Sequence, residues 1–329
     1  MFELAIIILL AFLLDLIFGD PRYRLHPIRL VGNCIGLLTR ILKGVGLGGK
    51  KGGMLLAALT ECIFIAAFLS LHLLFHELHF LLAFAFDLFV CYSCLALKDL
   101  ITHTELVTRA LEQGNLPDAR ASVAMIVSRD VQFLDENGIS RAAIETLAEN
   151  FVDGFLSPLF WYLIGGILGH LLGFSTVTTA LAFIIAFKVA STLDSMVGYK
   201  DAEFLEFGWA GAKLDDIMNF FPARFSLPIL FVGAWITNLK AMKGIKTALR
   251  DRLKHASPNS AHAESFVAGA LNIRLGGPTI YPTGKKDKPW LGEGNPDPSL
   301  LQIRETASML IRTAWLAISG SVVFLILLG

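Results

Sequence analysis

Two apolar runs joined by one short polar turn decide the fold class: MLLAALTECIFIAAFLSLHLLF (54–75), HELH (76–79) and FLLAFAFDLFVCYSCLAL (80–97). A helix that crosses a bilayer needs roughly 20 mainly apolar residues, with a tolerance of about 17 to 25, and both runs satisfy this requirement. The turn between them is so short that the two helices must run antiparallel. We therefore predict a helical hairpin that crosses a membrane twice.

The composition extends this prediction to the whole chain. Of the 329 residues, 54% are hydrophobic and 17% are charged, whereas a soluble domain is usually about 45–50% apolar and about 25% charged. We predict an all-α polytopic integral membrane protein, a single domain over residues 1–329, with about five to seven hydrophobic helices and long cytoplasmic helical loops. The formal net charge of zero argues against a nucleic-acid binder, which would carry a basic patch. Further apolar runs lie at about 2–18, 155–173, 176–193, 225–239 and 308–328.

Basic residues assign a side to each polar segment, because loops rich in Lys and Arg stay in the cytoplasm. The run 225–239 is short, contains Pro228 and precedes the basic stretch NLKAMKGIKTALRDRLKH (238–255). We expect this run to dip into the membrane and return, or to lie at the interface. The alternative is that 176–193, which contains Lys188, is the defective span. The segments predicted on the cytoplasmic face of the cell membrane are about 19–53, 98–154, 194–224 and 240–307.

Two polar segments show local structural signals. KDLITHTELVTRALEQGNLPDARASV (98–123) predicts two amphipathic helices broken at GNLP (114–117). The segment 276–298 is rich in Gly and Pro, and this composition predicts a loop.

The stretch LDDIMNFFPAR (214–224) gathers acids, an amide and an arginine in an otherwise apolar chain. On a helix, Asp215 and Asn219 are four residues apart and share a face. Mg²⁺ prefers hard oxygen ligands and commonly takes one or two carboxylates plus substrate phosphates. We therefore predict a metal–phosphate site here, with helix packing as the alternative. Asp194 is a further candidate, because it ends an apolar run that contains Lys188, and ionisable groups in such runs are often functional.

A second acidic group lies in SRDVQFLDENGISRAAIETLAENFVDGFLSPLF (128–160). Glu145, Glu149 and Asp153 are spaced four apart, so a helix would place them on one face, where their charges repel. We expect Arg141, one turn before Glu145, to absorb one of these charges. The segment predicts a Mg²⁺ or substrate-amine site, and a solvated helix face is the alternative.

Two further polar blocks are candidates for anion binding. DLIFGDPRYRLHPIRLVGN (15–33) crowds basic side chains after the first apolar run, as an anion site or as lipid-headgroup anchors. In HASPNSAHAESFVAGALNIRLGGP (255–278), SPNS (257–260) is a capping signal before a helix whose face is expected to carry His262 and Glu264. The small residues AGA (268–270) would permit close approach of another helix or of a flat ligand.

Taken in order, these blocks resemble a known family. DLIFGDPRYRLHPIRLVG, then SRD followed by RAAIETLAENFVDGFLSPLFWYLIGG, then KVASTLDSMVGYKDAEFLEFGWAGAKLDDIMNFFPAR, and then HASPNSAHAESFVAGALNIRLGG followed by PWLGEG are similar to the cobinamide-phosphate synthase family of cobalamin (vitamin B12) biosynthesis. The resemblance runs from Leu14 to about Gly294. A minor departure is Asn272, where the family pattern leads us to expect a glycine.

The resemblance implies an integral membrane ligase. It would join the propionic carboxyl group of adenosylcobyric acid to (R)-1-aminopropan-2-ol or its O-phosphate, giving adenosylcobinamide or its phosphate. ATP would be the co-substrate and Mg²⁺ the cofactor. The implied partners are thus the corrinoid, the amino alcohol and the lipid bilayer, with no nucleic acid; self-association of the chain stays open.

Within this reaction, the residues receive roles by their chemistry. We expect Asp215 and Asp216 to hold the metal, with Asp194 beside them. The catalytic candidates are Glu149, Asp153 and Asp194. The substrate-binding candidates are Arg22, His26, Arg29, Asn150, Lys200, Asn219, Arg224, Asn259, Glu264 and Arg274.

Three other functions compete with the ligase. A membrane transferase acting on a Mg-pyrophosphate substrate would require a second aspartate-rich motif, and the sequence has only the looser Glu149 and Asp153 pair. A transporter would place facing charges in mid-span, whereas most polar residues here lie outside the apolar runs. A non-catalytic signalling relative would not need all four motifs.

Overall fold

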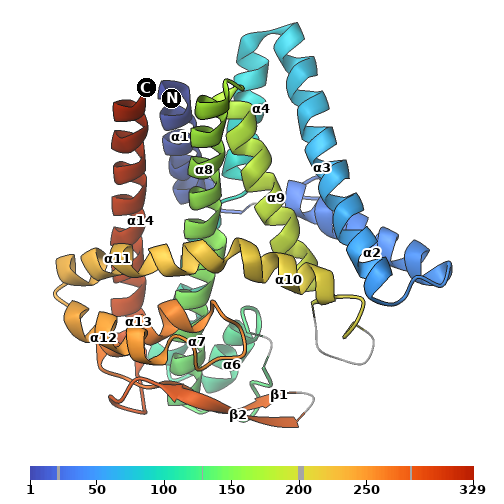
Figure 1. The fold of residues 1–329 in the computed structure, drawn as a ribbon. Coiled ribbons are helices and arrows are strands. Elements are labelled where there is room, and N and C mark those ends of the chain that lie inside the picture. The colour runs from blue at the N-terminus through green and yellow to red at the C-terminus, as the bar shows by residue number, and fades with distance from the viewer. Residues whose placement is uncertain (21–22, 128, 199–203, 282–283) are drawn as a thin grey trace. The chain divides into compact units, whose positions relative to one another are not determined.

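The computed structural model describes residues 1–20, 23–127, 129–198, 204–281 and 284–329 (Figure 1). The described chain is mainly helical and divides into two compact units. Each unit combines segments that lie far apart in the sequence. The first unit contains Met1–Ala96, Ser157–Asn219 and Ile318–Gly329, and the second contains Leu97–Leu156 and Phe220–Ala317.

The first unit is built on helical hairpins. Helices α3 (Lys50–Leu78) and α4 (Phe80–Tyr92) run side by side in opposite directions, as predicted (Figure 1). His79 alone separates them in an extended conformation, and its ring accepts a hydrogen bond from the Leu81 backbone N–H at 3.2 Å. The second hairpin, α8 (Ser157–Leu172) and α9 (Thr176–Val197), turns at Gly173, whose φ of 73° favours glycine. The other helices of this unit are α1 (Phe2–Phe18), α2 (Pro27–Gly44) and α10 (Trp209–Met218).

The membrane fold class is confirmed. In the described part of the chain, six helical stretches are long and apolar enough to cross a membrane, judged by length and composition. Helix α1 is a further apolar helix of 17 residues. The side of the membrane assigned to each loop, and the re-entrant or interfacial placement of 225–239, stay predictions. The six stretches are Lys50–Leu78, Phe80–Glu112, Glu136–Leu172, Thr176–Val197, Trp209–Ile236 and Leu300–Leu328.

The second unit is organised around helix α13 (Ala261–Leu271), whose residues 261–270 are all buried. Helix α12 (Ala241–Asp251) packs closely against it at Gly269, where an added Cβ would lie 2.6 Å from the Lys243 carbonyl oxygen. The small residues at 268–270 therefore serve the approach of another helix.

The predicted helix pair in 98–123 is also confirmed, as α5 (Leu97–Glu112) and α6 (Leu116–Ala124). The remaining helices are α7 (Glu136–Phe151), the π-helix η1 (Val152–Leu156), α11 (Phe220–Ile236) and α14 (Leu300–Leu328), which belongs to this unit up to Ala317.

The prediction of a loop over 276–298 is wrong for most of its length. The structure forms an antiparallel hairpin from β1 (Leu275–Tyr281) and β2 (Gly284–Leu291), with Leu275 paired to Leu291. A bulge between Gly276 and Pro278 breaks the alternation that would have marked a strand. Gly276 and Gly277 adopt φ values of 76° and 80°, so the glycines shape this bulge and do not prevent strand pairing.

A buried carboxylate fastens this hairpin to the helices. Asp251, fully buried at the end of α12, accepts a 2.8 Å hydrogen bond from the Gly292 backbone N–H just beyond β2. It also accepts hydrogen bonds from Arg250 at 2.8 and 2.7 Å and pairs with Lys254 at 2.7 Å. Burial alone would raise the pKa of Asp251, but these donors outweigh it and hold the pKa well below its usual range.

We predict that Asp251→Asn destabilises the second unit by about 1–3 kcal/mol at neutral pH, because a buried amide replaces a carboxylate held by charged donors. The lowered pKa means that the stabilisation is present above the ordinary aspartate pKa of about 4 and is lost as the pH falls below it. The difference between the thermal unfolding midpoints of wild type and variant in detergent should therefore shrink in acid.

The matched control is Glu293→Gln, which removes the other acidic partner of Arg250 at an exposed position. An exposed ion pair contributes little, so its unfolding midpoint should stay close to that of the wild type. Equal midpoints for Asp251→Asn and wild type at neutral pH would contradict the role of this carboxylate.

Candidate functional site

The first group of predicted residues lies in the first unit, where α10 crosses α9. Gly211 permits this approach, because an added Cβ there would lie 3.1 Å from the Leu193 Cβ and 3.5 Å from the Asp194 backbone nitrogen. One turn further along α10, Asp215 lies close enough to Asp194 and Lys188 for their charges to act on it. The packing of α10 on α9 thus brings the predicted acids of two separate motifs together.

Asn219 positions Asp215, as their spacing predicted. The buried Asn219 side chain donates to both carboxylate oxygens of Asp215, at 3.1 and 3.2 Å. Its own amide oxygen accepts a 2.7 Å hydrogen bond from the Ser157 hydroxyl at the start of α8. Asn219 therefore acts through Asp215, and its predicted contact with substrate stays untested.

The predicted metal ligands have different surroundings. Asp216 pairs with Lys213 at 3.2 Å, whereas Asp215 is held by Asn219. Across residues 1–20, 23–127, 129–198, 204–281 and 284–329, no group of three or more His, Cys, Asp or Glu side chains is arranged to hold a metal ion. A magnesium ion held by one or two carboxylates and by phosphate oxygens does not need such a group, so the metal role stays a prediction.

The second group lies in the second unit and contains more acids than the sequence motif indicated. Glu264 on α13 is buried, and its Oε1 lies 3.6 Å from Nδ1 of His255, in the loop before that helix. Glu145 and Glu149 on α7 and Lys288 on β2 are the other charged side chains that act on this pair. Three secondary-structure elements therefore supply one cluster of carboxylates and bases, which we call the acid–histidine cluster.

Burial and charge shift the protonation of this cluster. Burial, together with the charge of Glu145, raises the pKa of Glu264, and His255 and Lys288 only partly offset this effect. Burial lowers the pKa of His255, but its contact with Glu264 and the charge of that carboxyl raise it more, and the net direction is upward. A carboxyl group whose pKa is raised toward neutrality is suited to exchange protons with a substrate.

Glu145 has a structural partner that differs from the predicted one. It forms an ion pair with Arg129 and accepts a 2.6 Å hydrogen bond from the Gly276 backbone N–H. The expectation that Arg141 neutralises Glu145 is wrong. Arg141 donates instead to the Pro296 carbonyl at 2.6 Å, and its guanidinium carbon lies 4.9 Å from the centroid of the Trp290 ring. Folding brings Arg129, 16 residues away in the sequence, to Glu145, whereas Arg141, one helical turn away, bonds elsewhere.

The predicted catalytic residue Asp153 lies in the π-helix η1, which continues α7. The Asp153 side chain is half-buried. Asn150, near the end of α7, is exposed. The sequence did not indicate the change of helix type. Single π-helical turns are rare and occur frequently at functional sites, so this location supports retaining Asp153 as a candidate.

A third pairing joins two predicted substrate-binding residues, Arg224 on α11 and Asn259 before α13. The Arg224 guanidinium donates to the Asn259 Oδ1 at 3.3 Å and to the Phe220 carbonyl at 2.6 Å. Its central carbon lies 3.4 Å from the Phe220 ring centroid. The two motifs that contain Arg224 and Asn259 therefore meet in the second unit.

Helix α13 differs from its prediction in two respects. The expected cap is wrong, because Ser260 makes no side-chain hydrogen bond to the first turn. The shared face is also wrong: His262 lies beside Asn259, whose carbonyl its Nδ1 contacts at 3.1 Å, whereas Glu264 faces His255. Positions two apart on a helix are separated by about 200°.

The remaining candidates lie outside these groups or outside the described residues. His26 in the first unit is buried, with its Nε2 2.7 Å from Asp20 Oδ1, and Arg29 on α2 is exposed. Arg274 in the second unit is half-buried, and its backbone N–H donates to the Asn295 carbonyl at 2.8 Å. Arg22 and Lys200 lie outside the described residues. The acids of α9 and α10, like His26 and Arg29, belong to the first unit, whereas the acid–histidine cluster and the Arg224–Asn259 pair belong to the second.

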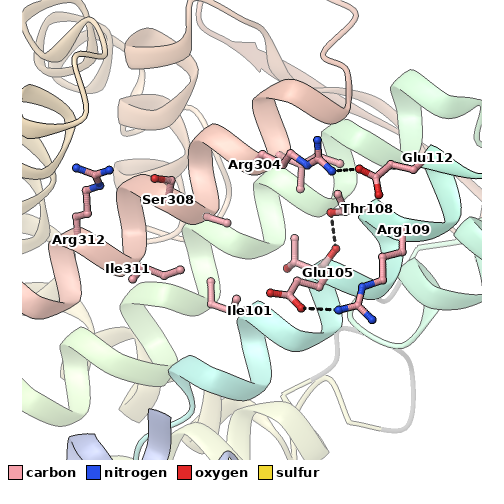
Figure 2. Close-up of a pocket in the computed structure, with 12 residues that line it drawn as sticks. Ile101, Glu105, Thr108, Arg109, Glu112, Arg304, Ser308, Ile311 and Arg312 are labelled. Atoms are coloured by element: carbon pink, nitrogen blue, oxygen red, sulfur yellow. Dashed lines mark hydrogen bonds and ion pairs between the residues drawn. The ribbon is translucent and has the colours of Figure 1, made fainter. Parts of the chain in front are cut away.

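A cavity of about 470 Å³ in the second unit lies between α5 and α14. Figure 2 shows Arg304 directed at Glu112 and Arg109 directed at Glu105, the latter pair 3.3 Å apart. The charged side chains on its walls thus largely satisfy one another. None of the predicted site residues lines it, so this cavity is separate from the groups described above.

These features define a class of protein: a polytopic helical membrane protein that gathers carboxylates, histidine and arginine into compact polar groups. Comparison with known proteins then identifies the family. The family model described as CobD/Cbib protein matches residues 8–310. No solved structure matches the chain.

Curated relatives agree with the family model. Cobalamin biosynthesis protein CobD of Pelobacter propionicus is 41% identical over 277 residues, covering 84% of this chain and 81% of the relative. Cobalamin biosynthesis protein CbiB of Salmonella typhimurium is 34% identical over 321 residues, covering 96% and 95%. CobD of Leptospira interrogans is 35% identical over 305 residues, covering 92% of each. The chain belongs to the CobD/CbiB family of cobalamin biosynthesis proteins, as the sequence motifs indicated.

The acid–histidine cluster predicts a contrast between two variants. Because the pKa of Glu264 is raised, its ionisation opposes folding as the pH rises above the ordinary glutamate pKa of about 4.3. Glu264→Gln removes this cost, so its thermal unfolding midpoint at pH 7 should equal or exceed that of the wild type. Glu145→Gln removes the opposite charge from an ion pair whose side chains are only 11% and 6% exposed, and should cost about 3–5 kcal/mol. Thermal unfolding of both variants in detergent checks this contrast. An equal loss in both variants would show that Glu264, like Glu145, is structural.

Proposed function

We propose that this protein is an adenosylcobinamide-phosphate synthase. It would form an amide bond between the propionic carboxyl group of adenosylcobyric acid and the amine of (R)-1-aminopropan-2-ol or its O-phosphate. The observation that carries the proposal is family membership across residues 8–310, since the relatives are named cobalamin biosynthesis proteins. The acid–histidine cluster supports it, because amide formation requires an amine that has lost its proton.

The chemistry requires activation of the acid. A carboxylate is a poor acyl donor, so the propionate oxygen would first attack the γ-phosphorus of ATP, releasing ADP and forming an acyl phosphate. The amine nitrogen would then attack the acyl carbon, the C–N bond would form, and inorganic phosphate would leave. The amine must give up its extra proton for this attack, and a carboxylate beside it can receive that proton.

The acid–histidine cluster is the proposed proton acceptor. Glu149 and Glu264 face one another across α7 and α13 with His255 beside them. Because burial raises the pKa of Glu264, its carboxylate is more basic than an exposed one and accepts a proton more readily near neutral pH. Asp153, two residues after the end of α7, is retained as a group that positions the amine.

The acids of α9 and α10 fit the chemistry of a magnesium ion. Asp194 and Asp215 act on each other with like charges, and a divalent cation relieves such repulsion. Asp215 and Asp216 would hold the ion together with phosphate oxygens. When bound, Mg²⁺ neutralises negative charge on the phosphates of ATP. The basic residues that predict a cytoplasmic location for these segments agree with a reaction that uses ATP.

Reconstitution tests the proposal directly. The purified full-length protein in lipid nanodiscs is incubated with adenosylcobyric acid, ATP, Mg²⁺ and either free or phosphorylated (R)-1-aminopropan-2-ol. We expect a product with the mass of the condensed corrinoid, together with ADP and inorganic phosphate in equal amounts. Release of AMP and pyrophosphate would show that the acid is activated as an acyl adenylate and would overturn the acyl phosphate step, and the absence of any condensed product would refute the proposal.

Asp215→Asn tests the magnesium role. The variant keeps the shape of the side chain but loses its negative charge, so we expect turnover to fall on the order of 10²-fold or more. The rate is measured across a range of Mg²⁺ concentrations. The matched control is Asp118→Asn at an exposed position on α6, which should keep the wild-type rate. Near-normal turnover by a membrane-inserted Asp215→Asn protein would exclude this residue as a metal ligand.

A further inference from the structure

A second polar group in the second unit contains basic side chains and no acid. Arg224 on α11, Arg252 just after α12 and His262 in the first turn of α13 act on one another electrostatically. Asn259 links them, because its side-chain oxygen accepts from Arg224 and its carbonyl contacts His262. The neighbouring Asp251 is bound by Arg250, Lys254 and Gly292.

The side-chain nitrogens in this group are only partly used. The Nε of Arg252 is buried and has no hydrogen-bond partner among the described residues, and the same holds for Nε2 of the fully buried His262. Arg224 uses its Nη1 for Asn259 and Phe220, and its stacking on the Phe220 ring fixes the plane of the guanidinium. Buried polar nitrogens without partners are costly, and bringing positive charges together adds to this cost.

The start of α13 adds further donors. Ser260 leaves the first turn without a side-chain cap, and the helix has 11 residues, so its first backbone N–H groups and its dipole favour a negative charge there. Planar guanidinium groups also bind phosphate oxygens, through paired N–H donors. An oxyanion would therefore satisfy the arginines and the helix terminus together.

His262 provides a link to protonation. Its Nδ1 lies 3.1 Å from the Asn259 carbonyl, which can only accept, so Nδ1 carries the hydrogen and Nε2 carries the lone pair of the neutral ring. Burial, followed by the charges of Arg224 and Arg252, lowers the pKa of His262 to about 4. Glu145 and Glu149 act on Glu264, which faces away from His262 on the other side of α13. A bound dianion would offset both arginine charges and favour a proton on Nε2.

We propose that Arg224, Arg252, His262 and the N-terminus of α13 form an oxyanion site that binds a phosphate monoester and takes up a proton at His262 on binding. In the proposed synthase, on which this step rests, the site would hold the phosphate of the amino alcohol phosphate. The phosphate ester is held and not broken, so the site positions the substrate.

Binding is measured without adenosylcobyric acid and without ATP, so its outcome is independent of synthase activity. The full-length protein in phosphatidylcholine nanodiscs is titrated with O-phosphoethanolamine by calorimetry at pH 7. We expect Arg252→Gln and Arg224→Gln each to weaken binding at least tenfold. Lys246→Gln, an exposed charge loss on α12, is the matched control and should leave the affinity unchanged. If Arg252→Gln does not fold, Arg252→Lys keeps the charge, loses the planar fork, and should still weaken binding.

Inorganic sulfate tests the proton, because it is a tetrahedral dianion that does not itself titrate near neutral pH. Titration in buffers of different ionisation enthalpy should show net proton uptake by the wild type. His262→Gln should bind sulfate more weakly and without that uptake. Equal affinities of Arg252→Gln and Lys246→Gln, or proton uptake that persists in His262→Gln, would overturn the proposal. A loss of phosphoethanolamine binding in nanodiscs containing phosphatidylglycerol would identify a lipid headgroup as the occupant and overturn it as well.

Discussion

Every backbone polar group that enters lipid must be hydrogen-bonded within the chain, and this constraint governs how the protein is built. It makes the apolar segments helical and leaves polar side chains to be satisfied where helices end or cross. The chain from Asp215 through Asn219 to Ser157 in the first unit is such an arrangement, in which each group has a partner on another turn or helix. Polar groups are thus gathered at a few places, and those places are the candidates for chemistry.

Buried charges in the second unit fall into two kinds. Asp251 and Glu145 each pair with a basic side chain and accept a hydrogen bond from a backbone N–H. Through these contacts, each acid ties one end of the β-hairpin to a helix. In the acid–histidine cluster, three carboxylates lie close together, and burial raises the pKa of Glu264. A carboxylate with matched donors stabilises the fold, whereas a buried one whose ionisation is costly is a candidate for function. This difference separates structural acids from functional candidates that look alike in the sequence.

The sequence was sufficient for features that depend on local pattern. The runs around HELH predicted α3 and α4, GNLP predicted the break between α5 and α6, and the spacing of Asp215 and Asn219 predicted their contact. It failed where distant segments decide the outcome. Arg129 reaches Glu145 only after folding, and His255 pairs with Glu264 through the loop before α13. The hairpin β1–β2 was missed because its bulge interrupts the two-residue period.

The departure from the family pattern at Asn272 has a physical explanation that bears on the site. Asn272 ends α13 with φ 57° and ψ 46°, a left-handed conformation that glycine adopts freely and asparagine tolerates better than most residues. The backbone N–H of Ile273, just beyond it, bonds to the Ala268 carbonyl, so α13 terminates as it would with glycine. A helix fixed at this end and packed along its length keeps a constant direction. The contacts of His262 with Asn259 and of Glu264 with His255 are thereby held on separate sides of one rigid helix, so the proposed oxyanion site and the proposed proton acceptor share a scaffold without sharing partners.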